Sequence, residues 1–238
     1  MILLAIDTSG KEGSIALARV PDAPRPRAAS TDASLEVEIV DLVPLEGGTF
    51  SAQLVPQISA LLAKHGLSKR DIGAFAVASG PGSFTGLRVG LAAIKALAEV
   101  LQKPIAAVSR LEAIAHIFLQ RDPGFAGPAV AALDAGRNQI YIGEYELGRG
   151  GARNVSERLV SLVEFLSEAR AVRVLTPDHH VAQAARDARL AVQEVLPPTS
   201  AAVARIGWEK IRAGDTISPE ALEANYIRRS DAEIFAKK

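Results

Sequence analysis

The chain has 238 residues, of which 48% are hydrophobic and 5% aromatic, and its 27 lysines and arginines balance its 27 aspartates and glutamates. This length suits one large domain or two small ones, and the balanced charge argues against autonomous binding of tRNA or DNA, which normally needs a basic excess. The absence of cysteine excludes disulfides, thiolate zinc sites and cysteine nucleophiles, and it fits a reducing cytoplasm.

The first predicted element is a β-hairpin. An apolar run at residues 2–6 reaches a polar, glycine-containing turn at residues 7–13 and returns as a second apolar run at residues 14–18. Two apolar runs around such a turn are typical of a hairpin. Because this start lacks a basic lead and reaches Asp7 after one short apolar run, we interpret it as a strand and not as a signal peptide.

A loop, a strand and a helix are predicted next. Prolines and charges at residues 21–27 indicate an exposed loop, and the strict alternation of residues 35–40 indicates a half-exposed strand. A helix follows at residues 51–65, and Gly66 can end it in the left-handed conformation. The apolar face of this helix consists of Leu54, Ile58, Leu61 and Leu62.

Residues 79–90 read Ser-Gly-Pro-Gly-Ser-Phe-Thr-Gly-Leu-Arg-Val-Gly, between a buried strand predicted at residues 74–78 and a helix that runs to about Gln102. This order of elements can place backbone N–H groups and hydroxyls around an anion, or it can simply let two helices pack closely. The stretch matches neither a Walker-type loop nor the dinucleotide-binding spacing. Ser83 and Thr85 accordingly either cap the helix or contact a ligand.

The helix opened by this turn carries two apolar stripes, which predict two surfaces to pack against. One is its own sheet, and the other is a further part of the chain or a second protein. Gly86 and Gly90, one turn apart, are predicted to let another helix approach closely. The first stripe contains Leu87, Gly90, Leu91, Ile94, Leu97, Ala98 and Leu101, and the second contains Val89, Ala93, Ala96 and Val100.

The second half of the chain repeats the opening pattern. A strand is predicted at residues 104–108, then a helix that starts at a Ser-x-x-Glu capping box, then a boundary rich in proline and glycine at residues 123–128. A hairpin follows at residues 130–143. Asp134 stands in it where Asp7 stands in the first hairpin, so we interpret the two halves as a duplication.

Strands and helices then alternate, which indicates an α/β fold with a mixed sheet in each half. The predicted elements are a short helix capped by Ser161 and Glu164, a strand at 172–175, a helix at 181–188, a strand at 190–195, a helix at 200–212 stopped by Gly214, and a helix start at Ser218 and Pro219.

Two αβ halves that each open with a strand–Asp–turn–strand hairpin resemble the actin/Hsp70/sugar-kinase superfamily, in which the two turns hold the phosphates of ATP. Within it, the chain resembles the bacterial TsaB (YeaZ) family. The pieces that carry this resemblance are Leu-Ala-Ile-Asp-Thr-Ser at residues 4–9, the glycine stretch at 80–90, Ala-Leu-Asp-Ala-Gly-Arg at 132–137 with Tyr141, and Ala-Asn-Tyr-Ile-Arg at 224–228.

The resemblance implies two RNase H-like, actin-like halves, with residues 1–108 carrying the partner-binding helices and residues 109–238 forming a smaller, degenerate half. It implies a cytoplasmic, non-catalytic subunit of the machinery that makes N6-threonylcarbamoyladenosine at position 37 of tRNAs. The larger relative TsaD would hold the metal and perform the transfer, and the ATPase TsaE would join them. The chain would meet tRNA only through this complex, would form a homodimer through the same helices when alone, and would not bind membranes.

The same resemblance assigns residues to a partner interface and to ligand contacts, and it assigns none to catalysis. The interface set is Leu54, Ile58, Leu61, Phe84, Thr85, Arg88, Val89, Ala93, Ala96, Leu97 and Val100. Residues expected near a nucleotide or ligand held together with the partner are Asp7, Glu12, Arg88, Asp134 and Arg137.

Metal binding is not expected of this chain. The catalytic relative has two histidines spaced by three residues where this chain has Arg110 and Ile114. His116 stands alone on a mainly apolar helix, and the adjacent His179 and His180 are predicted to lie at the surface. A metal site needs several converging ligands.

The role of Asp7 and Asp134 is open between two interpretations. An aspartate at a strand end can hold Mg²⁺ or orient a water, or it can close its own turn. The glycine pair against which superfamily members lay adenosine has no counterpart late in the chain, since the adjacent glycine pairs stand at residues 47–48 and 150–151. ATP and metal are therefore expected to belong to the partner subunits.

Two other functions remain as alternatives. The first is an autonomous, glycoprotease-like hydrolase or a kinase, dependent on ATP or metal, which would bind nucleotide or metal by itself. The second is a purely structural homo-oligomer with unrelated biology.

Overall fold

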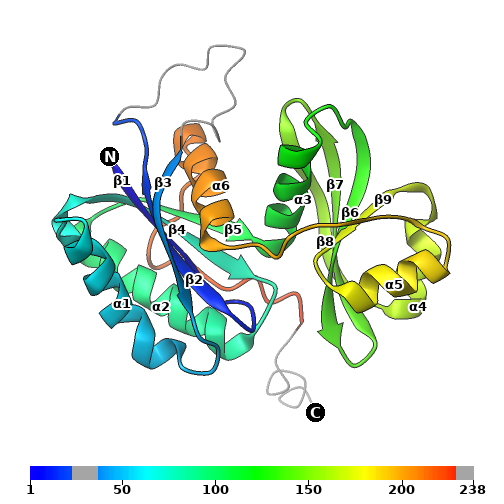
Figure 1. The fold of residues 1–238 in the computed structure, drawn as a ribbon, viewed down its shortest axis with the longest axis horizontal. Coiled ribbons are helices and arrows are strands. Elements are labelled where there is room, and N and C mark those ends of the chain that lie inside the picture. The colour runs from blue at the N-terminus through cyan, green and yellow to red at the C-terminus, as the bar shows by residue number, and fades with distance from the viewer. Residues whose placement is uncertain (23–36, 229–238) are drawn as a thin grey trace. The chain divides into compact units, whose positions relative to one another are not determined.

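The computed structural model describes residues 1–22 and 37–228, and the chain forms two compact units (Figure 1). Unit 1 comprises Met1–Ser109 and Thr199–Ala224, and unit 2 comprises Arg110–Pro198 and the chain from Asn225 onward. The predicted boundary after residue 108 lies where the chain first passes between the units. The division differs from the prediction at Thr199–Ala224, which returns to unit 1 because its helix packs on the first sheet.

Unit 1 is built on a five-stranded mixed sheet with the order β3-β2-β1-β4-β5. β1 pairs antiparallel with β2 and parallel with β4, so the predicted hairpin and the predicted mixed sheet are confirmed. The strands are β1 (Ile2–Asp7), β2 (Gly13–Arg19), β3 (Glu38–Leu45), β4 (Ile72–Gly80) and β5 (Ile105–Ser109).

Two predictions fall partly outside the described residues. Of the loop predicted at residues 21–27, only Pro21 and Asp22 are described, and of the strand predicted at 35–40, the description begins at Val37.

The helices of unit 1 begin and end close to their predicted bounds. They are α1 (Phe50–Lys64), α2 (Phe84–Leu101) and α6 (Ser200–Ala213), with a 3-10 turn at Lys69–Asp71. Gly66 and Gly214 follow α1 and α6 with φ of 66° and 76°. Both adopt the left-handed conformation, in which glycine has no steric penalty, and it was predicted for Gly66.

The two faces of the first sheet carry different side chains. Leu4, Ile6 and Phe75 pack in one hydrophobic cluster with the inner faces of α1 and α2. The neighbouring residues alternate to the other face, where alanines such as Ala76 let α6 come close. A Cβ added at Gly207 of α6 would stand only 2.4 Å from the Cβ of Ala76.

Unit 2 repeats this topology with a sheet of order β10-β9-β6-β7-β8. β6, β7 and β8 pair antiparallel, and β9 pairs parallel with β6 and β10. In both sheets an antiparallel trio is extended by two parallel strands, which supports the interpretation as a duplication. The strands are β6 (Gly127–Gly136), β7 (Gln139–Gly148), β8 (Gly151–Ser161), β9 (Arg173–Thr176) and β10 (Ala191–Glu194).

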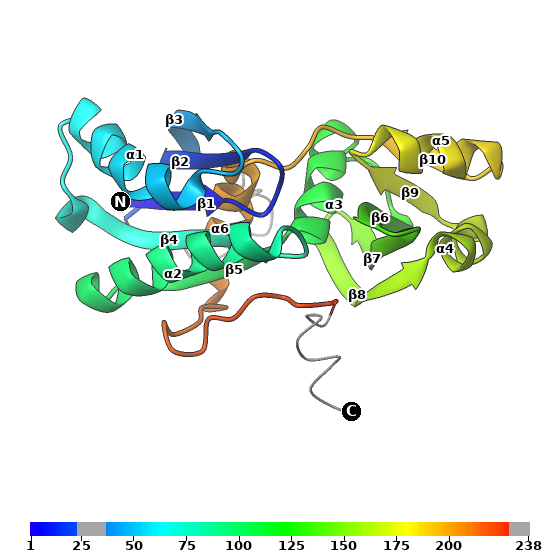
Figure 2. The same cartoon turned by 90° about the horizontal axis from the view of Figure 1, so that it is seen from below.

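Helices cover both faces of the second sheet (Figure 2). On one face α3 (Arg110–Arg121) packs around Leu133 and Tyr145. On the other, α4 (Leu162–Glu168) and α5 (His179–Asp187) pack around Ala132 and Ile142. A 3-10 turn at Ala169–Ala171 follows α4. No helix in the two described ranges is both long and apolar enough to cross a membrane.

Two details correct the sequence analysis. Strand β8, which pairs with β7 along its length, was not predicted. The helix predicted from Ser218 is wrong: the chain makes one turn there, in which the N–H of Leu222 donates to the oxygen of Ser218 at 3.1 Å. Ile217 bridges to Ile105 and Leu222 is buried in the core, and both contacts hold this segment against unit 1.

Candidate functional site

The glycine turn before α2 packs directly against the first hairpin turn. The backbone N–H of Ser83 donates to the backbone carbonyl of Ser9 at 2.7 Å, and the hydroxyl of Thr8 donates to the backbone carbonyl of Gly86 at 2.7 Å. A Cβ at Gly82 would stand 2.2 Å from the backbone oxygen of Ser9. The glycine turn therefore packs closely, but against the first hairpin turn and not between two helices.

The contacts of Gly86 and Gly90 correct the prediction that they admit another helix. A Cβ at Gly86 would lie 2.0 Å from the backbone oxygen of Thr8. A Cβ at Gly90 would lie 2.4 Å from the hydroxyl oxygen of Thr8. Both glycines make room for the β1–β2 turn of the same unit. Ser83 is an N-cap, since its hydroxyl accepts from the N–H of Gly86 at 3.3 Å, while Thr85 is exposed.

Asp7 closes its own turn. Its side chain is buried, and the same carboxylate oxygen accepts from the backbone N–H of Ser9 at 2.9 Å and from the Ser9 hydroxyl. A buried carboxylate needs such partners, because an unpaired charge there would be costly. Glu12, further along the same turn, is exposed.

Asp134 closes the second hairpin turn in the same manner, by accepting from the N–H of Gly136 at 2.9 Å. It is less buried than Asp7, and its second oxygen lies 3.3 Å from Nε2 of His180. Its own N–H donates to the carboxylate of Asp178 at 2.8 Å. Arg137 sits in this turn with φ of 57°.

The histidines do not assemble a metal site in the part of the chain that the structure describes, where no group of three or more metal-ligating side chains occurs. His116 contacts Gln120 at 3.1 Å, and His179 lies 3.4 Å from a carboxylate oxygen of Glu194. His179 and His180 are mostly exposed, as predicted.

The outer sides of α1 and α2 expose apolar side chains, and we call this surface the α1–α2 face. Val55 on α1 is 60% exposed, and Phe84 and Val100 on α2 are 36% and 71% exposed. Ala96, in the same stripe of α2 as Val100, is also exposed, whereas Val89 and Ala93 of that stripe are half-buried. The residues that form the face are Ala52, Val55, Pro56, Ala60, Phe84, Val89, Ala93, Ala96, Leu97 and Val100.

Three residues assigned to the interface lie elsewhere. Leu54, Ile58 and Leu61 are at most 4% exposed and belong to the core of unit 1. They therefore hold α1 against the sheet, and the residues between them on α1 provide its accessible side. Of the first stripe of α2, Leu97 and Leu101 are half-buried, and the other members are buried as predicted.

Arg88 projects from the first turns of α2 beside the α1–α2 face. Its guanidinium carbon lies 3.8 Å from the centroid of the Phe84 ring, a cation–π contact. The contact holds a positive charge over an exposed aromatic ring, a combination that is common in protein interfaces.

The C-terminal motif at residues 224–228 attaches to unit 2. The amide of Asn225 donates to Glu157 at 2.6 Å, and the other oxygen of Glu157 accepts from the hydroxyl of Tyr145 at 2.6 Å. Burial and the adjacent Glu157 raise the pKa of Tyr145 far above its usual range, so it stays a donor. Arg228 donates to the side-chain oxygen of Gln139 at 2.6 Å. The contact of Asn225 depends on β8, which carries Glu157, and neither contact of the motif was foreseen.

Comparison with known proteins places these observations in a family. Residues 46–203 match the family model described as TsaD: tRNA N6-adenosine threonylcarbamoyltransferase. The chain is 33% identical to TsaB of Bacillus subtilis over 150 residues, which cover 63% of this chain and 57% of that relative. It is 27% identical to TsaB of Escherichia coli over 241 residues, which cover 98% and 96%.

Solved structures agree with these matches. A Pseudomonas aeruginosa protein described as similar to peptidase YeaZ superposes with a TM-score of 0.69 at 25% identity, covering 95% of this chain and 99% of that one. YeaZ from the same organism gives a TM-score of 0.68 at 23% identity, covering 94% and 99%. The predicted two-half α/β fold is thereby confirmed.

Proposed function

Because the chain belongs to the TsaB (YeaZ) branch of the TsaD family, we propose that it acts in tRNA threonylcarbamoyladenosine biosynthesis as a non-catalytic subunit that binds a TsaD-type transferase. The partner carries the metal and the transfer chemistry, and a TsaE-type ATPase joins the pair. The chain meets tRNA through this complex in the cytoplasm.

The observation that carries this proposal is the α1–α2 face. Single exposed apolar residues are ordinary, but Val55, Phe84 and Val100 lie on two adjoining helices whose inner sides are already buried in the core. Apolar patches that extend over neighbouring elements mark sites of protein association. The guanidinium of Arg88 over Phe84 adds the kind of residue that interfaces favour.

The buried state of Asp7 supports a non-catalytic role. Its carboxylate is engaged by the N–H and hydroxyl of Ser9, and the adjoining glycine turn donates to the oxygen of Ser9. A nucleotide held at this turn would have to displace these contacts. We therefore expect isothermal titration calorimetry to detect no binding of Mg-ATP to the isolated chain, and saturable binding there would favour the autonomous enzyme.

The interface is tested by Val100→Glu. Val100 is 71% exposed, so the added charge leaves the core intact, while its burial in a complex would cost at least about 2 kcal/mol, or roughly 30-fold in affinity. We expect the variant to fail to co-elute with the cognate TsaD-type protein in size-exclusion chromatography, and the isolated variant to be monomeric.

The matched control is Val163→Glu, because Val163 on α4 is 78% exposed and lies in unit 2. It should co-elute as the wild type does. Co-elution of the Val100→Glu variant at wild-type strength would refute the assignment of the α1–α2 face.

A further inference from the structure

Unit 2 contains a pocket that the proposed function does not use. It has a volume of about 200 Å³ and opens beside α4, on the face of the second sheet opposite α3; we call it the α4 pocket. Its lining is apolar except for three carboxylates, and it consists of Pro128, Ala129, Val130, Ile142, Glu144, Tyr145, Glu146, Val155, Phe165, Glu168, Ala169 and Val172.

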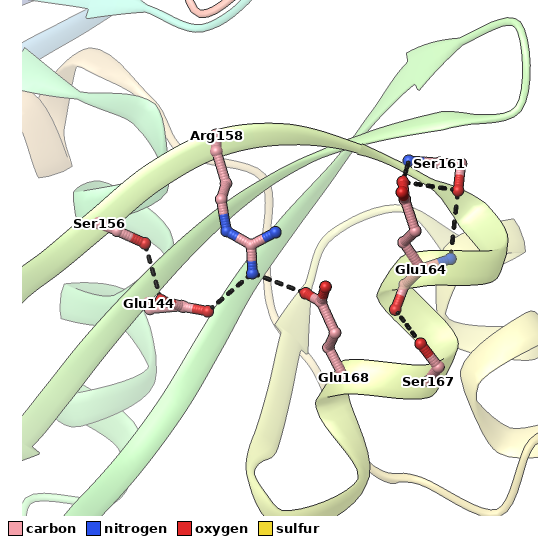
Figure 3. A network of polar contacts seen from close by, with 7 residues as sticks. All are labelled: Glu144, Ser156, Arg158, Ser161, Glu164, Ser167 and Glu168. Atoms are coloured by element: carbon pink, nitrogen blue, oxygen red, sulfur yellow. Dashed lines mark hydrogen bonds and ion pairs between the residues drawn. The ribbon is translucent and has the colours of Figure 1, made fainter.

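Two of these carboxylates share one guanidinium (Figure 3). Nη2 of Arg158 lies 3.0 Å from Glu144 and 2.6 Å from Glu168, and the hydroxyl of Ser156 donates to the other oxygen of Glu144 at 2.7 Å. Ser156 and then Arg158 lower the pKa of Glu144. Glu144 is therefore ionised at neutral pH, and the single guanidinium of Arg158 is shared between two carboxylate side chains.

The third carboxylate, Glu146, leaves the rim with an excess of negative charge. Glu146 is exposed and makes no ion pair with any residue of the described ranges. Arg153 stands opposite it across the β7–β8 pair, but no side-chain hydrogen bond or ion pair joins the two residues. The walls below this rim include Phe165, which is buried, and Val155, which is 53% exposed.

Size and charge together define the occupant. Pockets that hold whole small-molecule ligands usually measure about 300–1,000 Å³, so the α4 pocket suits a single side chain. An aliphatic stem matches the apolar walls, and a cationic head matches the acidic rim. Phosphate groups of RNA would be repelled by the same rim.

We propose that the α4 pocket receives an arginine side chain presented by a partner protein, with the stem against Val155 and Phe165 and the guanidinium on Glu146. Arginine suits this site better than lysine, because its planar guanidinium can engage a carboxylate through two parallel N–H donors. This docking site lies in unit 2 and does not depend on the α1–α2 face.

The test titrates the full chain, labelled with ¹⁵N, with N-acetyl-arginine amide and with N-acetyl-norleucine amide, which has an aliphatic stem and no charge. We expect the arginine probe to shift amide signals of β7, β8 and α4 with a dissociation constant on the order of millimolar. Added salt should weaken this binding, because the rim is accessible to solvent. The norleucine probe should bind several-fold more weakly.

Variants with exposed changes keep the test independent of folding. Glu146→Gln should weaken binding of the arginine probe several-fold. The control Asp122→Asn removes a charge of unit 2 outside the pocket and should leave this binding unchanged. Arg153→Gln removes a competing cation and should strengthen the binding. Equal binding of both probes, no shift at low salt, or no effect of Glu146→Gln would overturn the proposal. If sedimentation showed that Glu146→Gln loses self-association, the occupant would be a second copy of this chain, and the proposal of a partner protein would be overturned.

Discussion

At the scale of single residues, three glycines decide how closely α2 approaches the first hairpin. Gly82, Gly86 and Gly90 each stand where a Cβ would be within 2.4 Å of Thr8 or Ser9. Gly82 and Gly86 face the backbone oxygens of Ser9 and Thr8, which cannot yield as the end of a flexible side chain would. Gly90 faces the hydroxyl of Thr8, which is held by its hydrogen bond to the backbone oxygen of Gly86.

Gly86→Ala should therefore destabilise unit 1 by about 3 kcal/mol, at the upper end of what overpacking costs. The single tryptophan, Trp208, is buried in α6, so its fluorescence during urea denaturation reports unit 1 alone. Gly148→Ala is the matched control, because a Cβ there meets no atom within 4 Å. An unchanged midpoint for Gly86→Ala would contradict the packing described here.

The sequence identified many of these residues but not what they touch. Asp7 and Asp134 were found because each ends an apolar strand before a glycine turn, a local pattern. The partner of Gly86 is Thr8, 78 residues earlier in the chain, and no local pattern encodes that contact. For the same reason Leu54, Ile58 and Leu61 were assigned to a partner when their partner is the sheet.

At the scale of elements, one carboxylate ties β3 to the end of α1. Asp41 on β3 accepts from Nζ of Lys64 at 2.7 Å and from Nε2 of His65 at 2.8 Å. Lys64 first, and then His65, lower the pKa of Asp41 from 3.8 to about 2. The basic residues also stand at the C-terminus of α1, where the helix dipole favours positive charge.

Asp41→Asn should lower the stability of unit 1 at neutral pH. Because the folded-state pKa is depressed, this stabilisation is fully present above the ordinary pKa of 3.8 and is lost as pH falls toward about 2. Urea midpoints from Trp208 fluorescence should therefore differ between wild type and variant at pH 7 and converge between about pH 4 and pH 2. Glu99→Gln, which removes an exposed carboxylate of α2, serves as control, and a pH-independent difference for Asp41→Asn would contradict this account.

Predicting elements from sequence succeeded where apolar periodicity was strong, as in α2 and β1. Strand β8 was missed because its residues are mostly exposed or half-buried and read as polar. The available signal was the glycine-rich turn at residues 148–151, which allows β7 to return as a hairpin. Missing β8 also hid the network of Glu144 and Arg158.

At the scale of the whole molecule, neither unit is a continuous piece of chain. Unit 2 is completed by residues from Asn225, whose amide donates to Glu157, while Ile227 packs against the α3 side of the second sheet. The motif at residues 224–228 therefore has a structural role in unit 2, beyond its use as a family marker.

Ending the chain after Ala224 should destabilise unit 2, because Glu157 loses a donor worth about 1.5–3 kcal/mol and Ile227 leaves the core. All three tyrosines lie in unit 2. Hydrogen exchange of the β7 and β8 amides measures the stability of this unit directly. A chain ending after Arg228 is the control and should retain wild-type protection in these strands. Equal protection in the two truncated chains would show that the motif contributes nothing to unit 2.

The return of Thr199–Ala224 to unit 1 has a consequence for synthesis on the ribosome. Among the residues that the structure describes, α6 is the helix that covers the alanine-lined side of the first sheet, and all of Arg110–Pro198 must be translated before it. At roughly 5–20 residues per second this delay lasts on the order of five to twenty seconds. The nascent N-terminal half therefore waits with an uncovered sheet while the later half is made, a period in which chaperones have access to it.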